Sequence, residues 1–335
     1  MTNKKYLIVG AGGFIGGHIS KKLIDEGNTV IGVDIKPKQF WFQDFNEMQC
    51  YYGMDMKEYK NCLKSISNVD YVINMACNMG GMGFIENNKA ECMLSVLINT
   101  NLLRACLKNK VKKYFFSSTA CVYNIKKQDE TFVKGLKEKD AYPAMPEDGY
   151  GWEKLFSERM CRHFMEDFGL EVRIGRYHNI YGPMGTYDGG REKAPAALCR
   201  KIANSVINNK KEIEIWGDGK QTRSFLYIDD CVEGTLRLFN SNHSEPLNIG
   251  SDEQVSINQM VDILEKIAGV ENLKRNYLLD KPKGVRGRSS DNKNAIKVLK
   301  WQYKISLHEG LVKTYNWIYS EMKKNSKSSK KYTKF

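Results

Sequence analysis

Two side chains four residues apart, Tyr150 and Lys154, have the spacing for proton chemistry in the segment "YGWEK". At the start of a predicted helix, this spacing places both side chains on one face. A phenol with a pKa of about 10 is a poor base at neutral pH, but a neighbouring ammonium group favours the phenolate. The pair is therefore a candidate for removing a proton from a hydroxyl group, and the alternative is an ordinary surface pair.

A second candidate segment is "SSTACVY" (117–123), which is small and polar and contains Cys121. It follows "KKYFF", which predicts a buried strand. The carboxyl end of a strand in an open α/β sheet is a common place for chemistry. Thr119 can bond a reacting hydroxyl group there. Cys121 is either a small residue that packs in the core or a thiol placed at a substrate.

A nucleotide site is indicated at the start of the chain by "VGAGGFIGG", with Gly10, Gly13 and Gly16 three residues apart. The glycines lie between a predicted strand and a predicted helix. Such glycines let the backbone approach a pyrophosphate, while the helix N-terminus supplies N–H groups and a positive dipole. The motif alone is weak, but its position predicts a dinucleotide.

Two acidic residues extend this prediction. Asp34 ends the next predicted strand, where a carboxylate accepts from the adenosine 2′-hydroxyl and repels a 2′-phosphate. This favours NAD over NADP, although Lys36 and Lys38 are close by. Asp55, in "GMDM", is either a contact to the adenine or a plain loop residue.

These candidates are positioned by alternating elements. The predicted strands are 5–10, 29–34, 71–76, 112–118 and 171–177, and the predicted helices are 14–27, about 87–108 and 148–169. Alternation of this kind predicts an α/β fold with a Rossmann-type doubly wound parallel sheet. We expect the NAD-binding domain to cover 1–180, with segments at about 220–255 returning to it. A smaller, discontinuous C-terminal α/β substrate domain is expected over 181–322.

The composition indicates a globular protein without a metal site. Apolar residues make up 41% and charged residues 27% of the 335 residues, as in ordinary globular proteins. We see no signal peptide and no membrane span. The nine cysteines form no Cys-x-x-Cys pair, which predicts reduced thiols and a cytoplasmic location. The five histidines show no metal-ligand spacing, so no metal is expected.

The net charge of +13 invites a nucleic-acid interpretation, but the last thirteen residues contribute six lysines and no acid. This segment, 323–335, predicts a basic disordered tail. No nucleic-acid motif is present, and a basic surface also suits a phosphate-bearing small substrate.

Taken in order, the glycine motif, Ser-Ser-Thr and Tyr-x-x-x-Lys resemble the extended short-chain dehydrogenase/reductases, the NAD-dependent nucleotide-sugar epimerases and dehydratases. Longer blocks over about residues 5 to 320 resemble the family of GDP-mannose 3,5-epimerases. These blocks are "MGGMGF" (79–84), "ACVY" (120–123), "RIGRYHNIYGP" (173–183), "GGREKAPAA" (189–197), "WGDGKQTRSF" (216–225), "EPLNIGSDE" (245–253) and "GVRGRSSDN" (284–292). The chain departs from this family at "VYNIKK", at Gly149 and in a longer segment before "WGDG".

The resemblance implies a reaction on GDP-mannose that gives GDP-L-galactose and GDP-L-gulose. NAD would oxidise C4 while Tyr150 removes the hydroxyl proton and Lys154 holds the nicotinamide ribose. The ketone would make the C–H bonds at C3 and C5 acidic. Cys121, with a pKa lowered by the cationic cofactor, would be the base, and Lys193 the opposing acid. A packing role for Cys121 and a surface or phosphate-contact role for Lys193 remain the alternatives.

The same resemblance implies further contacts and a partner. Helices near 87–108 and 150–168 resemble those that pair into a four-helix bundle in homodimers, although monomer core explains their apolar faces equally well. Besides the catalytic and cofactor residues named above, the resemblance implies that Phe14 and Ile15 contact the cofactor. It implies that the sugar or a phosphate is contacted by Gly80, Ala120, Asn179, Glu192, Ala194 and Lys201. It implies that the diphosphate or the guanosine is contacted by Gln221, Thr222, Arg223 and Arg288.

Rival functions remain open. A 4,6-dehydratase would be expected to carry Asp-Glu after the catalytic threonine, where this chain has Ala120-Cys121. A C4 epimerase would leave Cys121 and Lys193 without a role, and a non-catalytic nucleotide-sensing or RNA-binding protein would tolerate loss of Tyr150 and Lys154. The sugar itself, mannose or a related GDP-hexose or GDP-heptose, and inversion at C5 alone or at both C3 and C5 also remain open.

Overall fold

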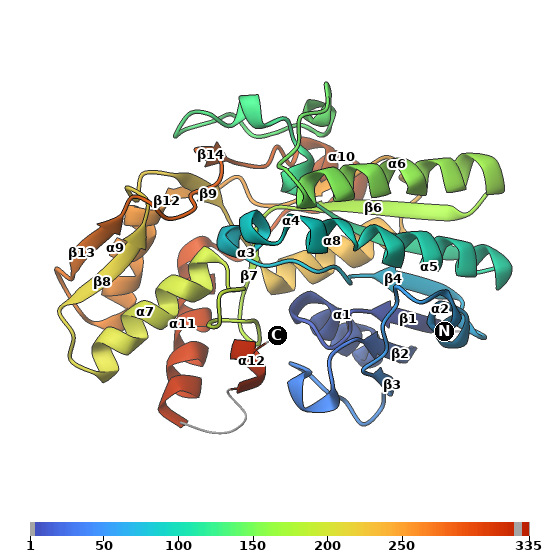
Figure 1. Cartoon of the computed structure of the whole chain (residues 1–335), viewed down its shortest axis with the longest axis horizontal. Coiled ribbons are helices and arrows are strands. Elements are labelled where there is room, and N and C mark those ends of the chain that lie inside the picture. Colours follow the sequence, from blue (N-terminus) through green and yellow to red (C-terminus); the bar gives the residue numbers. More distant parts are fainter. Residues whose placement is uncertain (1–3, 325–329, 335) are drawn as a thin grey trace.

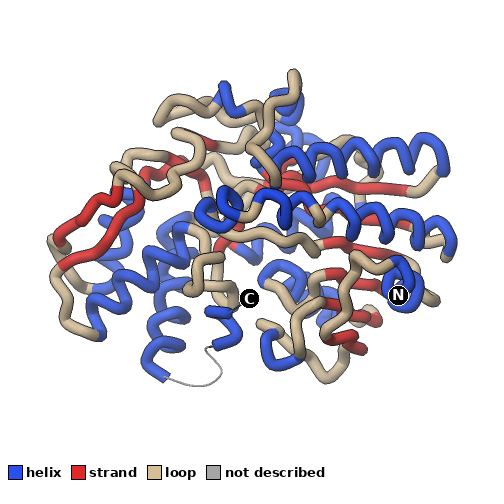
Figure 2. The backbone as a smooth tube through the Cα atoms, in the orientation of Figure 1, coloured by secondary structure: helices blue, strands red, loops and turns tan. Residues whose placement is uncertain are grey.

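A seven-stranded parallel sheet forms the larger part of the chain (Figures 1 and 2). The computed structural model describes residues 4–324 and 330–334. In sheet order the strands are β11 (Leu247–Ile249), β6 (Glu171–Tyr177), β5 (Lys113–Thr119), β4 (Tyr71–Asn74), β1 (Lys5–Val9), β2 (Thr29–Asp34) and β3 (Gln49–Tyr52). The prediction of a doubly wound parallel sheet is confirmed. The sequence did not predict β3 at the sheet edge or the return of β11 beside β6 as a strand.

Helices cover both faces of this sheet, and the central strands are buried on both sides. In β1, Tyr6 and Ile8 pack into one hydrophobic core while Leu7 and Val9 pack into the other. Parallel strands that are buried on both faces have nearly continuous apolar sequences. The helices of one face are α1 (Phe14–Asp25) and α8 (Ile228–Asn240), and those of the other are α2 (Tyr59–Ile66), α5 (Val96–Lys108) and α6 (Tyr150–Phe168).

The helix predicted at about 87–108 is broken into separate pieces. α3 (Met82–Asn87) and α4 (Lys89–Met93) precede α5, and a turn at Leu94 and Ser95 separates α4 from α5. The hydroxyl of Ser95 accepts from the backbone N–H of Asn78 at 2.9 Å, which ties this turn to the loop after β4. By length and composition alone, Lys89–Lys108 is apolar enough to cross a membrane. Part of the stretch, however, packs in the core against α2 and α6.

The smaller part sits over the carboxyl edge of the sheet and is built mainly from helices α7, α9 and α11, which pack on one another (Figure 1). Short sheets flank them: β8 pairs with β13, β9 with β12 and β14, and β7 with β10. The bounds are β7 (Ile180–Tyr181), α7 (Ala194–Ile207), β8 (Glu212–Trp216), β9 (Thr222–Ser224), β10 (Leu226–Tyr227), β12 (Gln254–Ser256), α9 (Ile257–Ala268), β13 (Lys274–Leu278), β14 (Gly287–Arg288), α10 (Lys293–Leu299), α11 (Leu307–Lys324) and α12 (Lys331–Lys334). Short 3₁₀ turns add η1 (Lys38–Phe40), η2 (Ala120–Val122), η3 (Ile125–Lys127) and η4 (Glu138–Ala141).

The prediction of a disordered tail over 323–335 is wrong for the described part of that segment. Residues 323–324 end α11, and Lys331–Lys334 form α12. Tyr332 is 5% exposed and packs its ring against other aromatic rings. One buried aromatic side chain removes a large apolar area from water, which the lysine-rich composition of the tail conceals. Residues 325–329 and 335 lie outside the described residues.

Candidate active site

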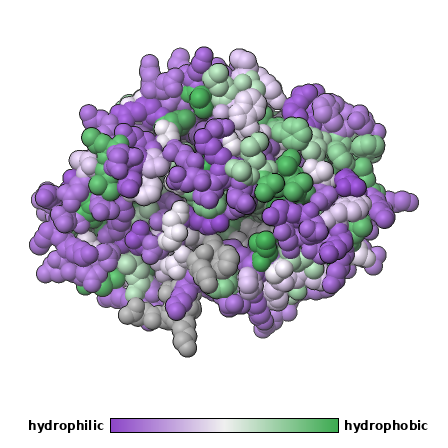
Figure 3. All heavy atoms as spheres, in the orientation of Figure 1, coloured by the Kyte–Doolittle hydropathy of each residue, from purple (hydrophilic) through white to green (hydrophobic). Residues whose placement is uncertain are grey.

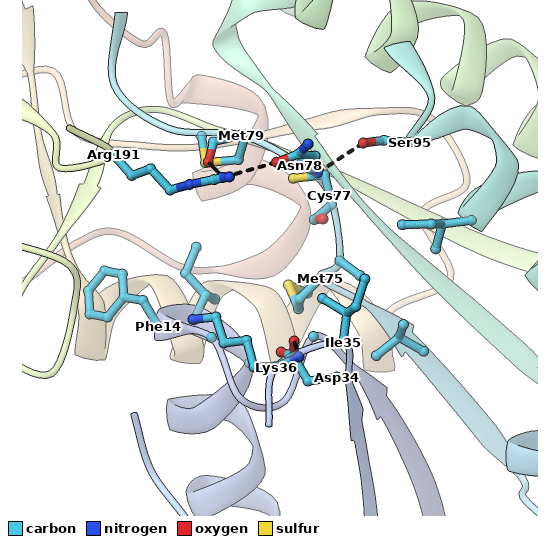
Figure 4. A pocket seen from close by; sticks show the side chains of 18 of the residues that line it. Phe14, Asp34, Ile35, Lys36, Met75, Cys77, Asn78, Met79, Ser95 and Arg191 are labelled. Atoms are coloured by element: carbon cyan, nitrogen blue, oxygen red, sulfur yellow. Dashed lines mark hydrogen bonds between the residues drawn. The ribbon is translucent and has the colours of Figure 1, made fainter. Parts of the chain in front are cut away.

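A cavity of about 580 Å³ opens between the carboxyl ends of the strands and the smaller part of the chain (Figure 4). Its walls come from the loop after β1, the ends of β2 and β5, the loop after β4, the start of α6 and the start of α7. This is the position in which open α/β sheets bind their ligands. Among the described residues, no group of three or more His, Cys, Asp or Glu residues could hold a metal ion.

The glycine motif forms a tight turn at one end of this cavity. Gly10 has a φ of +83°, and the backbone N–H of Gly13 donates to the Gly10 carbonyl at 3.0 Å. A Cβ atom on Gly16 would lie 2.1 Å from the same carbonyl oxygen, so only glycine fits there. Phe14 and Ile15 begin α1 and line the cavity. The turn and the helix N-terminus fit the pyrophosphate of a dinucleotide.

Both predicted carboxylates line the cavity, and Figure 4 shows Asp34 beside Lys36. Asp34 is 8% exposed and accepts from the backbone N–H of Lys36 at 3.0 Å. Burial raises the pKa of Asp34, although the Lys36 ammonium group opposes the shift. Burial also lowers the pKa of Lys36 to about 8. Asp55 accepts from the backbone N–H of Lys57 at 2.8 Å and lines the cavity.

Tyr150 is the first residue of α6 and Lys154 follows one turn later, and both are buried. Lys154 donates from Nζ to the carbonyl of Ser117 at 3.0 Å, and Nζ lies 5.8 Å from the centroid of the Tyr150 ring. Burial raises the pKa of Tyr150 well above its ordinary value, Cys77 and Cys121 add to the shift, and Thr119 opposes it. The protein alone therefore shifts this pKa away from the phenolate, because desolvation disfavours the charged form. The predicted shift toward the phenolate invoked a positively charged nicotinamide together with the ammonium group, and it stays a prediction.

Cys121 lies in the η2 turn directly after β5 and is 7% exposed. Its backbone N–H donates to the Thr119 hydroxyl at 3.3 Å. Burial raises the pKa of the thiol to about 11, the nearby carboxylate of Glu147 contributes, and Arg288 opposes the shift. The protein around the thiol therefore shifts its pKa in the direction opposite to the predicted one, because the sequence showed neither the burial nor the carboxylate.

Lys193 precedes α7 as its N-cap residue and lines the cavity with Tyr150 and Thr119. Burial lowers its pKa, and the nearby Cys121 opposes the shift. The ammonium group and the thiol are thus close enough for their charges to influence each other, and they come from different elements, the residue before α7 and the η2 turn. Three of the five predicted catalytic residues, Thr119, Tyr150 and Lys193, line the cavity. Lys154 and Cys121 do not line it: Lys154 binds the Ser117 carbonyl, and Cys121 packs in one hydrophobic cluster with Tyr150.

Sequence reasoning missed two charged residues at this site, Arg191 and Glu147. The Arg191 guanidinium lies 3.9 Å from the centroid of the Phe84 ring and donates to the Asn78 side chain at 2.9 Å and to the Met79 carbonyl at 3.1 Å. Figure 4 shows this bridge from the loop before α7 to the loop after β4. The only signal in the sequence was that Arg191 lies inside the block "GGREKAPAA".

The predicted diphosphate and guanosine contacts do not line this cavity and instead bind protein atoms. Arg223 donates to the carbonyls of Thr222, Lys283 and Val285. Arg288 is 3% exposed and binds the side chains of Gln128, Glu147 and Cys121. Gln221 donates to the Trp216 carbonyl at 3.0 Å, and the Thr222 hydroxyl donates to the carbonyl of Thr131.

Of the predicted sugar contacts, Thr119 and Lys193 line the cavity, and the others, Cys121 included, do not. Gly80 packs against Phe84 and Arg191, and Ala120 is buried in the η2 turn beside Cys121. Asn179 donates to the Ser224 carbonyl, Glu192 binds the Gly190 N–H and Arg200, and Lys201 donates to the Glu214 carbonyl. Ala194 begins α7. Their roles toward a substrate stay predictions.

Residues 6–250 match the model of the NAD dependent epimerase/dehydratase family. GDP-mannose 3,5-epimerase of Arabidopsis thaliana is 47% identical over 325 residues, which cover 96% of this chain and 84% of that protein. GDP-mannose 3,5-epimerase 1 of Oryza sativa subsp. indica is 48% identical over 320 residues, or 95% and 82% of the two chains.

Solved structures with the same architecture include the UDP-glucose 4-epimerase of Thermotoga maritima with UDP-glucose. The two structures superpose with a TM-score of 0.83 and 26% sequence identity, and the match covers 95% of this chain and 99% of the epimerase chain. The UDP-glucuronic acid 4-epimerase of Bacillus cereus, in complex with UDP-glucuronic acid and NAD, has a TM-score of 0.80 and 28% identity and covers 94% and 99%.

Proposed function

The chain belongs to the NAD dependent epimerase/dehydratase family, and from this premise we propose that it converts GDP-mannose to GDP-L-galactose and GDP-L-gulose. The observation that carries the proposal is near 50% identity to two GDP-mannose 3,5-epimerases over almost the whole chain. Lys193, which lines the cavity, and Cys121, which packs with the cavity residue Tyr150, support it, because inversion of a ring carbon needs two extra proton-transfer groups.

When bound, NAD supplies a reversible acceptor for the hydride at sugar C4. In the proposal, Tyr150 takes the proton of the C4 hydroxyl, and Thr119, whose hydrogen bond lowers the pKa of the phenol, assists it. With C4 as a ketone, the C–H bonds at C3 and C5 become acidic. Inversion then needs one group that removes a proton from one ring face and one group that adds a proton to the other. Cys121 and Lys193 are the side chains that fill these two roles in the proposal.

The choice of NAD over NADP is also part of the proposal. The Gly10 turn and the N-terminus of α1 fit a dinucleotide, and Asp34 ends β2 at the cavity where an adenosine ribose would lie. A carboxylate there accepts from a 2′-hydroxyl and repels a 2′-phosphate. The UDP-glucuronic acid 4-epimerase with the same fold contains NAD.

We also propose a homodimer in which α5 and α6 of two copies form a four-helix bundle. Trp152 and Phe156 on α6 are 44% and 56% exposed, and Met93, Leu94 and Leu97 are exposed on α4, the following turn and α5. Figure 3 shows hydrophobic residues gathered at the upper right, over the region of α5 and α6. Exposed apolar groups of this kind mark association surfaces.

A cytoplasmic location remains a proposal that rests on the unpaired cysteines.

The test is to incubate the purified protein with GDP-mannose and to identify the products by NMR. We expect GDP-L-galactose together with GDP-L-gulose. Inversion at C5 alone would restrict the proposal to a 5-epimerase, and a 4-keto-6-deoxy product would replace it by a 4,6-dehydratase. A related GDP-hexose or GDP-heptose that reacts while GDP-mannose does not would change the sugar but keep the chemistry.

A further inference from the structure

Tyr332, near the end of the chain, joins the cofactor-binding part to the smaller part. Its ring packs edge-on against Trp317 of α11, with centroids 4.8 Å apart, and lies 5.2 Å from the ring of Phe42. Its hydroxyl donates to the Phe42 carbonyl at 3.3 Å. Phe42 lies in the loop after η1 and lines the cavity. Figure 1 shows α12 between α11 and the loops that follow β2.

The other side of the same segment contacts the loop that precedes α7. The Tyr332 ring stacks on Tyr187 with centroids 6.2 Å apart, and the backbone N–H of Tyr187 donates to the Tyr332 carbonyl at 3.1 Å. Gly189 has a φ of +94°, and a Cβ atom there would lie 1.8 Å from the carbonyl oxygen of Thr333. The loop therefore passes so close to the chain end that no side chain fits between them.

This loop carries two groups of the candidate site. Arg191 and Lys193 line the cavity, and Lys193 is the proposed proton donor or acceptor at the ring. The carbonyl of Tyr187 accepts from Arg200 at 2.9 Å. This bond ties the loop to α7, the helix that begins directly after Lys193. Tyr332 thus contacts both a wall of the cofactor cavity, through Phe42, and the loop that holds the acid–base lysine.

We propose that residues 330–334 form a clamp, with Tyr332 as a positioning residue, that holds the Lys193 loop against the cofactor-binding part during ring inversion. This inference rests on the proposed function. Tyr332 acts through Tyr187 and Phe42 and does not touch the reacting atoms. Proton transfer depends steeply on placement, and a displacement of about 1 Å at a reacting group costs on the order of 100-fold in rate.

The test compares Tyr332→Ala with Tyr332→Phe in the full chain. GDP-mannose is added in heavy water, and NADH absorbance reports C4 oxidation while deuterium uptake at C3 and C5 reports ring inversion. We expect Tyr332→Ala to slow deuterium uptake about tenfold to 100-fold and to slow NADH formation much less, because the Tyr150 and Lys154 pair lies on α6. Tyr332→Phe keeps the ring stacking and should behave like the wild type.

A matched control is Tyr277→Ala, since Tyr277 is exposed on β13 and lies outside both contacts. A second variant, Gly189→Ala, pushes Thr333 away without changing Tyr332 and should give the same separation of the two signals. Equal loss of both signals, or no loss, would overturn the clamp. If the wild type takes up no deuterium, the proposed function fails, and the clamp is then judged by NAD release alone. The release should be faster in Tyr332→Ala than in Tyr277→Ala, and equal release rates would overturn it.

Discussion

Replacing Glu147 by glutamine should make Cys121 more reactive. The Glu147 backbone N–H donates to the Cys121 carbonyl at 3.0 Å, and the Glu147 carboxylate forms an ion pair with Arg288, which lies 3.6 Å from the Cys121 sulfur. Burial would raise the pKa of Glu147, but the charge and hydrogen bond of Arg288, together with Cys121 and Arg223, outweigh burial and hold this pKa below its ordinary value. The carboxylate is therefore negative at neutral pH, and its charge opposes a thiolate at Cys121.

The expected size follows from the pKa of the thiol, which is about 11 in the native protein. At pH 8 such a thiol is thiolate in about one molecule in a thousand, against about a quarter for an ordinary cysteine. Glu147→Gln removes the negative charge beside the thiol. The positive charge of Arg288 remains and is no longer neutralised by the carboxylate, so the pKa of Cys121 falls. Each unit by which the pKa of Cys121 falls gives about ten times more thiolate. The intrinsic nucleophilicity of the thiolate falls about threefold at the same time, so the net gain in reaction rate is about threefold per unit.

The assay is alkylation by iodoacetamide between pH 7 and 10, followed by mass spectrometry of the Cys121 peptide. We expect faster alkylation in Glu147→Gln at every pH below the native thiol pKa, and a plateau that is reached at lower pH. Cys50 serves as the internal reference because it lies on β3, away from Glu147. An unchanged or slower rate at Cys121 in the folded variant would refute the electrostatic reasoning.

Further predictions concern the reaction itself. Tyr150→Phe should retain bound NAD but abolish turnover of GDP-mannose, and inversion at a near wild-type rate would remove Tyr150 from the C4 step. Because Asp34 ends β2 and lines the cavity, and is proposed to bind the ribose, cofactor extracted from the purified protein should be NAD, and mainly NADP would contradict this role. Cys121→Ala should still oxidise and reduce C4 but should take up no deuterium at C3 or C5 in heavy water. Wild-type protein should take up deuterium at both carbons and none at C4, and normal uptake in Cys121→Ala would leave the thiol only a packing role.

The fold class was predictable because its signals are local. The apolar strand runs 5–10, 29–34 and 171–177 appear where predicted, since a strand buried on both faces has few polar positions. The helix at 87–108 was predicted as one element because its apolar spacing continues through the turn. Its interruption depends on the contact between Ser95 and Asn78, which are distant in sequence.

The candidate site was predictable where a motif is contiguous, as in the Gly10 turn and the Tyr150 and Lys154 pair, and the resemblance to GDP-mannose 3,5-epimerases was confirmed by the relatives. The electrostatics were not predictable. The pKa of Cys121 depends on Glu147 and Arg288, which approach it from 26 and 167 residues along the chain. No local pattern carries such contacts, and the same holds for the burial of Tyr332.

The turn at Leu94 and Ser95 links the cavity to the outer surface of the molecule. Leu94 lines the cavity and is also 43% exposed beside Met93 and Leu97, and Ser95 binds the loop that carries Asn78. In a homodimer paired through this face, the wall of each cavity would be supported by the neighbouring subunit. Dilution to the monomer would then loosen cofactor binding as well as assembly, so specific activity should fall as the protein concentration is lowered.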